Sequence, residues 1–180
     1  MFKKIIIGLC IALAFTQAYA SELKVKVEVD QKPRFWYNEE SVHCLALNIY
    51  FEARVDHTAG QAAVADVVLN RVLHQDYPNT ICEVIYEGPV SKWWKEKHGK
   101  DVPLRNRCQF SWYCDGKSDE PKENDAWQKA YDIALGMIVT DKYRGISEGA
   151  THYHATYVNP SWSKRLYLVG RIGHHIFYRK

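Results

Sequence analysis

The sequence lacks a marked excess of either charge. Its 180 residues include 24 lysines and arginines against 21 aspartates and glutamates, a net charge of +3. Without Lys3 and Lys4, which lie in a stretch that we expect to be cleaved, 22 basic residues stand against 21 acidic ones. Binding nucleic acid requires a basic excess that neutralises phosphates, so the composition argues against nucleic acid as the main partner.

The sequence also lacks an apolar run long enough to span a bilayer comfortably. The run at 5–15 follows Lys3 and Lys4 and precedes the small residues of Ala18-Tyr-Ala20. This order is typical of a secretory signal peptide rather than a transmembrane helix. We therefore expect residues 1–20 to be removed, leaving an exported protein, periplasmic or secreted, without stable membrane insertion. Residues 21–37 would form an N-terminal extension, and residues 38–180 a single domain.

Recognisable metal-binding motifs are absent as well. No C-x-x-C or H-E-x-x-H spacing occurs, so we predict no metal site and no cofactor. Four cysteines remain after the signal peptide, and an even number in an exported protein is typical of disulfides. Four cysteines permit three pairings, of which we favour the one with a short loop: Cys108–Cys114 together with Cys44–Cys82. A catalytic cysteine is less favoured because an oxidising compartment promotes paired thiols.

The stretch LALNIYFEAR at 45–54 predicts a helix with a carboxylate on its apolar side. One stripe of this helix holds three apolar residues and an acid, namely Val42, Leu45, Ile49 and Glu52. A buried carboxylate costs free energy unless it is paired or protonated, so its pKa should rise. Enzymes that need a general acid near neutral pH use such a residue. Alternatively, Glu52 pairs with Arg54, Arg71 or another cation and has a purely structural role.

Local start signals predict further helices. Asn38 can cap the first helix, and Thr58 and Thr80 are each followed three residues later by Gln or Glu, the spacing of a capping box. The second helix would continue to residue 73, and the short third helix would cover 81–86. Pro121 suits the first turn of a helix whose apolar residues recur up to residue 139. The polar segment 89–106, with two adjacent tryptophans among lysines, predicts a surface loop.

The C-terminal part has a different pattern. Residues 150–155, 166–169 and 175–178 predict two or three short antiparallel strands. His152 and His154 would share one strand face, and His174 or His175 could approach from the next strand. A metal cluster is the less favoured interpretation, because satisfied or sugar-contacting histidines are commoner where no acidic or thiol ligand stands at a fixed spacing.

Several short motifs, taken in chain order, resemble those of one known family. They are LALNIYFEAR (45–54), GQAAVA (60–65), VLNR (68–71), YPNT (77–80), VI (84–85), QFS (109–111), the alanine-rich helix, ATHY (150–153) and IGHHIFY (172–178). From about residue 40 to the C-terminus the chain resembles the SleB-type cell wall hydrolases, the family of the spore cortex-lytic enzymes. The resemblance implies a lysozyme-like α+β fold, with a mainly helical core and a small antiparallel sheet from the C-terminal part. Residues 38–180 would then be the catalytic domain.

The resemblance also implies an activity: cleavage of the MurNAc–GlcNAc bond in peptidoglycan glycan strands, in the manner of a lytic transglycosylase. Glu52 would be the one general acid and base. The implied substrate-binding residues are Gln109, Phe110, Ser111, Thr151 and Tyr153. His174 and Tyr178 match the closing motif and are expected to support the fold. We expect a monomer that acts on peptidoglycan.

Two other functions and one mechanistic question stay open at this point. A metal-dependent peptidoglycan amidase or peptidase would use the C-terminal histidines, and a wall-binding module would have lost catalysis. A two-carboxylate glycosidase would need a partner for Glu52. Asp56, Asp66 and Asp115 are the candidates, and the sequence alone does not choose between an anhydro product and a reducing sugar.

Overall fold

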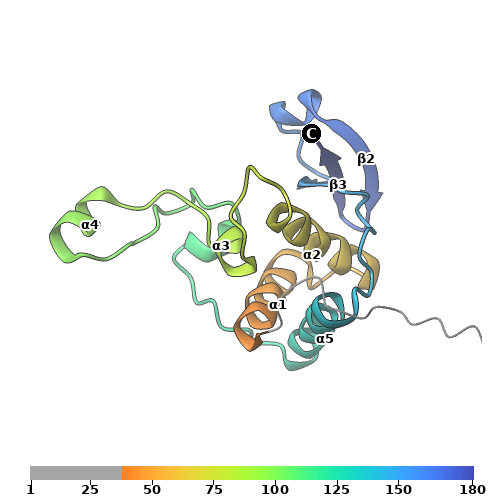
Figure 1. Ribbon diagram of the computed structural model, residues 1–180, viewed down its shortest axis with the longest axis horizontal. Coiled ribbons are helices and arrows are strands. Elements are labelled where there is room, and N and C mark those ends of the chain that lie inside the picture. Colours follow the sequence, from red (N-terminus) through yellow and green to blue (C-terminus); the bar gives the residue numbers. More distant parts are fainter. Residues whose placement is uncertain (1–37) are drawn as a thin grey trace, which may run out of the picture. The chain divides into compact units, whose positions relative to one another are not determined.

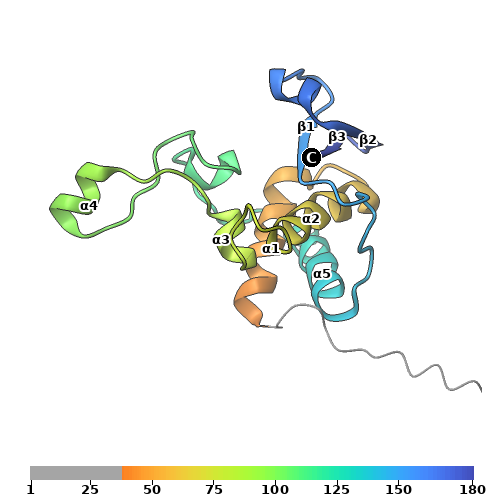
Figure 2. The ribbon, with the colours of Figure 1, turned by 45° about the horizontal axis from the view of Figure 1, so that its top comes forward.

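The computed structural model describes residues 38–180, so the predicted signal peptide (1–20) and N-terminal extension (21–37) lie outside the described residues. Three helices form the core: α1 (Glu39–Ala53), α2 (Thr58–Val72) and α5 (Asn124–Thr140). The short helix α3 (Ile81–Ile85) packs against α1 and α2 (Figures 1 and 2). Val42, Leu45 and Ile49 of α1 are fully buried among these helices.

Two of the predicted helix starts are confirmed. The side chain of Asn38 accepts a hydrogen bond of 2.6 Å from the amide of Ser41 and caps α1. Thr80 caps α3 and contacts Glu83 twice, accepting 3.3 Å from its amide and donating 2.7 Å to its carboxylate. Both helices therefore begin at a residue whose side-chain oxygen accepts a hydrogen bond from a backbone amide that the helix leaves unpaired.

The predicted cap of α2 is wrong by one residue. His57, not Thr58, is the N-cap, and its Nδ1 accepts 3.3 Å from the amide of Gly60. Gln61 does not complete a capping box. Its buried amide donates 3.1 Å to the carbonyl of Asp56, so it closes the turn between α1 and α2. Gln61 therefore bonds to the turn that precedes α2 instead of making the capping contact that its spacing suggested.

Helix α5 begins at Asn124, so Pro121 precedes the helix and does not occupy its first turn. The predicted apolar stripe is otherwise correct, because its buried residues are Ala130, Ile133, Ala134, Met137 and Ile138. These side chains belong to the hydrophobic core, in which α5 packs mainly against α1 and also contacts α2.

The segment predicted as a surface loop contains a helix, α4 (Lys92–His98). Ser91 caps it by accepting 3.4 Å from the amide of Trp94, and Gly99 ends it in the left-handed conformation at φ 65°. None of its residues is buried, and α4 lies apart from the helical core and the sheet in both views (Figures 1 and 2). The loop prediction was wrong here because no apolar periodicity marks a helix that has no buried face.

The C-terminal part forms a three-stranded antiparallel sheet. Its strands are β1 (His152–Ala155), β2 (Tyr167–Ile172) and β3 (His175–Arg179), in the order β1-β3-β2. Buried Phe177 of the central strand packs against Val64 and Val67 of α2. The predicted α+β fold, mainly helical with a small C-terminal sheet, is confirmed.

Both predicted disulfides are confirmed. Cys44–Cys82 joins α1 to α3, and Cys108–Cys114 spans the short 3₁₀-helix η1 (Ser111–Cys114). Over residues 38–180, none of the helices combines the length and apolarity needed to cross a bilayer.

Candidate active-site cleft

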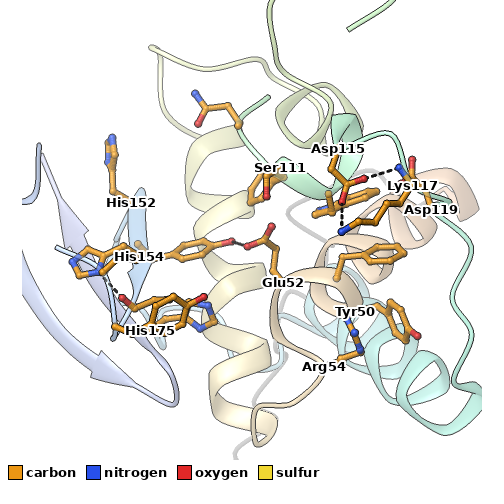
Figure 3. A pocket seen from close by; sticks show the side chains of 18 of the residues that line it. Tyr50, Glu52, Arg54, Ser111, Asp115, Lys117, Asp119, His152, His154 and His175 are labelled. Atoms are coloured by element: carbon orange, nitrogen blue, oxygen red, sulfur yellow. Dashed lines mark hydrogen bonds and ion pairs between the residues drawn. The ribbon is translucent and has the colours of Figure 1, made fainter. Parts of the chain in front are cut away.

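A cleft of about 840 Å³ runs beside the C-terminal end of α1. Glu52, in the last turn of that helix, points into it (Figure 3). On one side lies the sheet with His152 and His154, and on the other lies the segment that carries Asp115 and Asp119 (Figure 3). The predicted stripe therefore carries its one carboxylate to the boundary between the helical core and the sheet.

The surroundings of Glu52 favour its protonated form. Burial raises the pKa of its carboxyl, and two weaker effects oppose that rise. Tyr153 Oη donates 3.0 Å to Oε2 of Glu52, and the positive charge of Arg71 lies nearby. The net effect is a carboxyl group held above its ordinary pKa and oriented by the partly buried phenol of Tyr153.

The arginines that could have neutralised Glu52 are engaged elsewhere. Arg54 pairs with Glu123 at 3.6 Å, and Arg71 Nε donates 2.8 Å to the carbonyl of Thr151. Within residues 38–180, no ion pair joins Glu52 to either arginine. Neither of these two arginines therefore provides the ion pair that a purely structural role of Glu52 would require among residues 38–180.

Arg71 nevertheless belongs to the cleft. Its guanidinium lies over the rings of Tyr77 and Phe110, at 5.3 and 5.4 Å from their centroids. Its Nη1 is buried and has no hydrogen-bond partner among the described residues. A buried, unpaired donor is costly, so Nη1 is a candidate donor to an oxygen of a bound ligand. The preceding Asn70 instead holds a distant loop by donating 2.9 Å to the carbonyl of Ala150.

One wall of the cleft is the segment around η1. Of the predicted substrate-binding residues, Gln109, Phe110 and Ser111 line this wall. Trp112 fixes it to α1 by donating 3.1 Å from Nε1 to Oδ1 of Asn48 and by stacking on Phe51. The Cys108–Cys114 disulfide closes the same segment, so the wall is held at both ends.

The acidic segment 115–123, which follows η1, is held to the end of α1 by the Tyr50 hydroxyl and by the Arg54–Glu123 ion pair. Tyr50 Oη accepts hydrogen bonds from the amides of Lys122 and Glu123, at 3.1 and 3.3 Å. Asp115 and Asp119 line the cleft from this segment. Burial raises the pKa of Asp119, and the charge of Asp115 adds to that rise. Asp115 itself pairs with a neighbouring lysine (Figure 3).

Asp56 lies outside the cleft and clamps the sheet to the helices. It accepts 3.1 Å from the amide of His174, and its carboxylate contacts the rings of His174 and His175. The approach is so close that a Cβ on Gly173 would lie 2.7 Å from Oδ1 of Asp56. Asp56 is therefore structural, and this contact explains the glycine in the β2–β3 turn.

Asp66, in the middle of α2, is also engaged. Its fully buried carboxylate pairs with Arg144 and accepts hydrogen bonds from Ser147 of 3.1 Å (amide) and 2.6 Å (hydroxyl). It holds the segment between α5 and β1 against the helix. Of the three candidate partners for Glu52, Asp115 alone lines the cleft.

The sheet provides the opposite wall. Tyr153 and His152 line this wall. Thr151, which was also predicted to bind substrate, is buried and does not line the cleft. Thr151 Oγ1 lies 3.0 Å from Nδ1 of His152. Burial and the charge of Arg71 lower the pKa of His152 to about 4, so its ring is neutral at physiological pH.

An aromatic cluster that no sequence motif indicated completes this wall. Trp162, in the 3₁₀-helix η2 (Ser161–Arg165), lines the cleft, with its ring 5.5 Å from His152 and 5.7 Å from His154. His154 Nε2 lies 3.0 Å from the hydroxyl of Tyr178. Residues 38–180 contain no group of three or more His, Cys, Asp or Glu side chains arranged to hold a metal ion.

The sequence matches a cell wall hydrolase family model over residues 55–178, a range that begins just after Glu52. Curated relatives are spore cortex-lytic enzymes. That of Halalkalibacterium halodurans is 28% identical over 142 residues, covering 78% of this chain and 35% of that protein. That of Bacillus cereus is 41% identical over 51 residues, 28% of this chain and 20% of that protein. The chain thus spans about a third or less of the length of these relatives.

Solved structures share the fold. The catalytic domain of the germination-specific lytic transglycosylase SleB from Bacillus anthracis aligns with a TM-score of 0.55 and 24% identity, over 79% of this chain and 97% of that one. The catalytic domain of Bacillus cereus SleB aligns with a TM-score of 0.53 and 24% identity, over 80% and 93%. Since the family model also covers more than half of the sequence, this chain belongs to the cell wall hydrolase family.

Proposed function

We propose that this protein cleaves the MurNAc–GlcNAc bond of peptidoglycan as a lytic transglycosylase, with Glu52 as its general acid and base. The observation that carries the proposal is a half-buried carboxyl group with a raised pKa, which lines the cleft and is not paired with either neighbouring arginine. A protonated acid near neutral pH can donate to a glycosidic oxygen. Membership of the cell wall hydrolase family supports peptidoglycan as the polymer.

In the first step, protonated Glu52 donates its proton to the bridging oxygen, and the bond between that oxygen and C1 of the muramyl residue breaks. The carbonyl oxygen of the substrate's own N-acetyl group bonds to C1 from the other side. The leaving GlcNAc departs with the donated proton on its hydroxyl. Tyr153 Oη, 3.0 Å from the carboxylate, stabilises the ionised Glu52 that this step creates.

In the second step, the carboxylate of Glu52 accepts the proton of the C6 hydroxyl of the same muramyl residue. O6 then bonds to C1 and displaces the N-acetyl oxygen, which leaves a 1,6-anhydro end and restores the acid. No water is consumed and no second protein carboxylate is required. This is the chemistry that suits a site in which Asp56 and Asp66 are engaged elsewhere.

The rest of the cleft supplies groups that suit an N-acetylated sugar. Gln109 and Ser111 offer amide and hydroxyl groups, and the ring of Trp162 offers a face on which a sugar can stack. Arg71 Nη1 can donate to a substrate oxygen, because nothing described in the protein occupies it. Thr151 is buried and does not line the cleft, so it would not contact the substrate.

The competing mechanism is hydrolysis with two carboxylates. Asp119 is its strongest candidate for the second group, because it lines the cleft and burial raises its pKa. A base opposite Glu52 would activate water and yield a reducing sugar instead of an anhydro end. Glu52→Gln and Asp119→Asn therefore form a matched pair of neutralising substitutions.

The test is digestion of purified sacculi followed by mass spectrometry of the released muropeptides. We expect anhydro products, lighter than the hydrolytic ones by one water, from the wild type and from Asp119→Asn. Glu52→Gln should lower turnover by roughly 10²-fold or more, since a positioned general acid contributes about 10²–10⁴. Reducing-end products that disappear in Asp119→Asn would overturn the single-acid mechanism.

Two controls address the other functions. A metal-dependent amidase or peptidase would release peptides and lose activity in a chelator, whereas glycan cleavage by Glu52 should persist. A pure wall-binding module would sediment with sacculi yet release nothing, and Glu52→Gln would then change nothing. Because peptidoglycan lies outside the cytoplasm, the proposal includes export under the predicted signal peptide at residues 1–20.

A further inference from the structure

Residues 89–107 form an extension, the arm, which precedes the cleft-lining residues around η1 in the chain. Two main-chain hydrogen bonds of 2.8 Å close its base, from Ser91 to Val102 and from Leu104 to Pro89. The Cys108–Cys114 disulfide follows directly, and Gln109 and Ser111 of the cleft come next. The arm is therefore a closed, anchored extension (Figures 1 and 2). The residues that follow it in the chain line the cleft.

The tip of the arm exposes two large aromatic side chains. Trp93 and Trp94 of α4 are 54% and 40% exposed, and no residue of the helix is buried. A helix of seven residues gains little stability by itself, and packing against the core does not explain these rings. Exposed aromatic side chains set in polar surroundings are typical of binding surfaces.

The tip is ordered by contacts among its own rings and cations. The centroids of the Trp93 and Trp94 rings lie 5.1 Å apart, and the ring of His98 lies 4.6 Å from that of Trp94. Lys97 Nζ is 5.1 Å from the centroid of the Trp93 ring. Such mutual packing lowers the entropy lost when a ligand binds.

Charge indicates which kind of ligand the arm suits. The arm contains six basic and two acidic residues, whereas the rest of residues 38–180 contains 12 basic and 16 acidic residues. The positive charge is therefore concentrated on the arm and favours an anionic ligand. Residues 91–101 contain no Leu, Ile, Val, Phe or Met. A helix that lies in a lipid surface needs an extended apolar face, and α4 offers only two adjacent tryptophans within seven residues. The tip therefore suits an anionic carbohydrate better than a membrane.

We propose that the tip of the arm is a second, non-catalytic binding site for peptidoglycan. Trp93 and Trp94 would stack against sugar rings, and Lys97 and Lys100 would contact the carboxylates of peptide stems. The arm is joined directly to the segment that lines the cleft. It would therefore hold the enzyme on the peptidoglycan while the cleft cleaves a glycan strand. The assignment of peptidoglycan as the ligand of the arm rests on the proposed function.

The test measures co-sedimentation of the full mature chain with purified sacculi, in the Glu52→Gln background so that the sacculi stay intact. Trp93→Ala/Trp94→Ala should weaken binding about tenfold, as expected for the loss of two aromatic contacts. Trp93→Tyr/Trp94→Tyr, which keeps two aromatic faces, should restore most of it. The matched control is Tyr167→Ala/Leu168→Ala, whose side chains are 62% and 55% exposed on β2, and it should bind like the parent.

The charge component has its own readouts. Lys97→Gln/Lys100→Gln should reduce the dependence of binding on salt, and sacculi whose carboxylates have been amidated should bind the parent and this variant equally. Anionic vesicles of phosphatidylglycerol and phosphatidylethanolamine test the membrane alternative. Equal sacculus binding by the alanine variant and the control would overturn the proposal, as would an effect confined to the vesicles.

The outcomes separate this proposal from the proposed function. Arm-dependent binding to sacculi without any glycan cleavage by the wild type would leave the second site standing and overturn the enzyme. Normal cleavage with binding independent of the arm would do the reverse. In the active protein, the alanine variant should lose more activity on intact sacculi than on short soluble glycan fragments, which cannot reach both sites.

Discussion

Replacing Glu52 with glutamine should stabilise the fold at neutral pH while it slows cleavage. Glutamine keeps the shape of the side chain and an acceptor for Tyr153 Oη, but it carries no charge. Burial raises the pKa of Glu52, so the folded wild type resists ionisation that the unfolded chain undergoes freely. Each unit by which the pKa rises corresponds to about 1.4 kcal/mol of stability lost on ionisation. In a domain of this size that is roughly 3–6 °C in melting temperature.

The sign of this effect can be checked through its pH dependence. Below the ordinary glutamate pKa of about 4.3, the carboxyl is protonated in both the folded and unfolded chains, and the substitution gains nothing by this route. As the pH rises through the raised pKa of the folded protein, the wild type loses stability that Glu52→Gln retains. The difference between their melting temperatures should therefore be small near pH 4 and grow towards neutral pH.

Circular dichroism melts over this pH range, with sacculus clearance measured in parallel, provide the assay. Glu123→Gln is a suitable control, because that carboxylate is 64% exposed and its pair with Arg54 lies at the surface. It should shift the melting temperature little at any pH. If Glu52→Gln instead melts below the wild type at every pH, Glu52 is a structural partner and the reasoning from its burial fails.

Three further predictions follow from other contacts. Tyr153→Phe removes the donor to ionised Glu52, so the pKa of Glu52 should rise further and the alkaline limb of the pH–activity profile should move up by about one unit; an unmoved limb would contradict the role of that hydroxyl. Asp66→Asn leaves Arg144 without its buried counter-charge and should cost about 3–5 kcal/mol in chemical denaturation, against little change for exposed Asp125→Asn. Replacing the Cys44–Cys82 pair with serines should cost about 4 kcal/mol, more than replacing Cys108–Cys114, because 38 residues rather than 6 separate its ends; an inverted order of melting temperatures would refute the comparison.

Local pattern was sufficient for much of the fold. Helical spacing placed Glu52 on the stripe of buried Val42 and Leu45, because a helix with one apolar side must turn that side inward. An even number of cysteines with one close pair predicted both disulfides correctly. The alternation of apolar and polar residues, interrupted by glycines, predicted the short strands of the C-terminal part. Such a pattern can be recognised within a few consecutive residues, because both the strand and the turn that ends it are local.

The limits of local pattern appear where a second partner competes. Thr58 has capping-box spacing, yet the buried Gln61 is drawn to the carbonyl of Asp56 and His57 takes the cap. Helix α4 escaped prediction because its order comes from a capping serine and ring contacts rather than from an apolar stripe.

The sequence by itself indicated most of the elements, favoured the cysteine pairs that the structure contains, carried the motifs of the family and pointed to Glu52 as a candidate acid. Only the tertiary structure decided the environment of that acid: Tyr153 lies 101 positions further along the chain, and Asp56 is occupied by His174, 118 positions away. The same holds for Trp162 and for the unpaired Nη1 of Arg71 in the cleft. The pKa of a side chain depends on all the groups that displace water from it, and distant segments supply most of those groups.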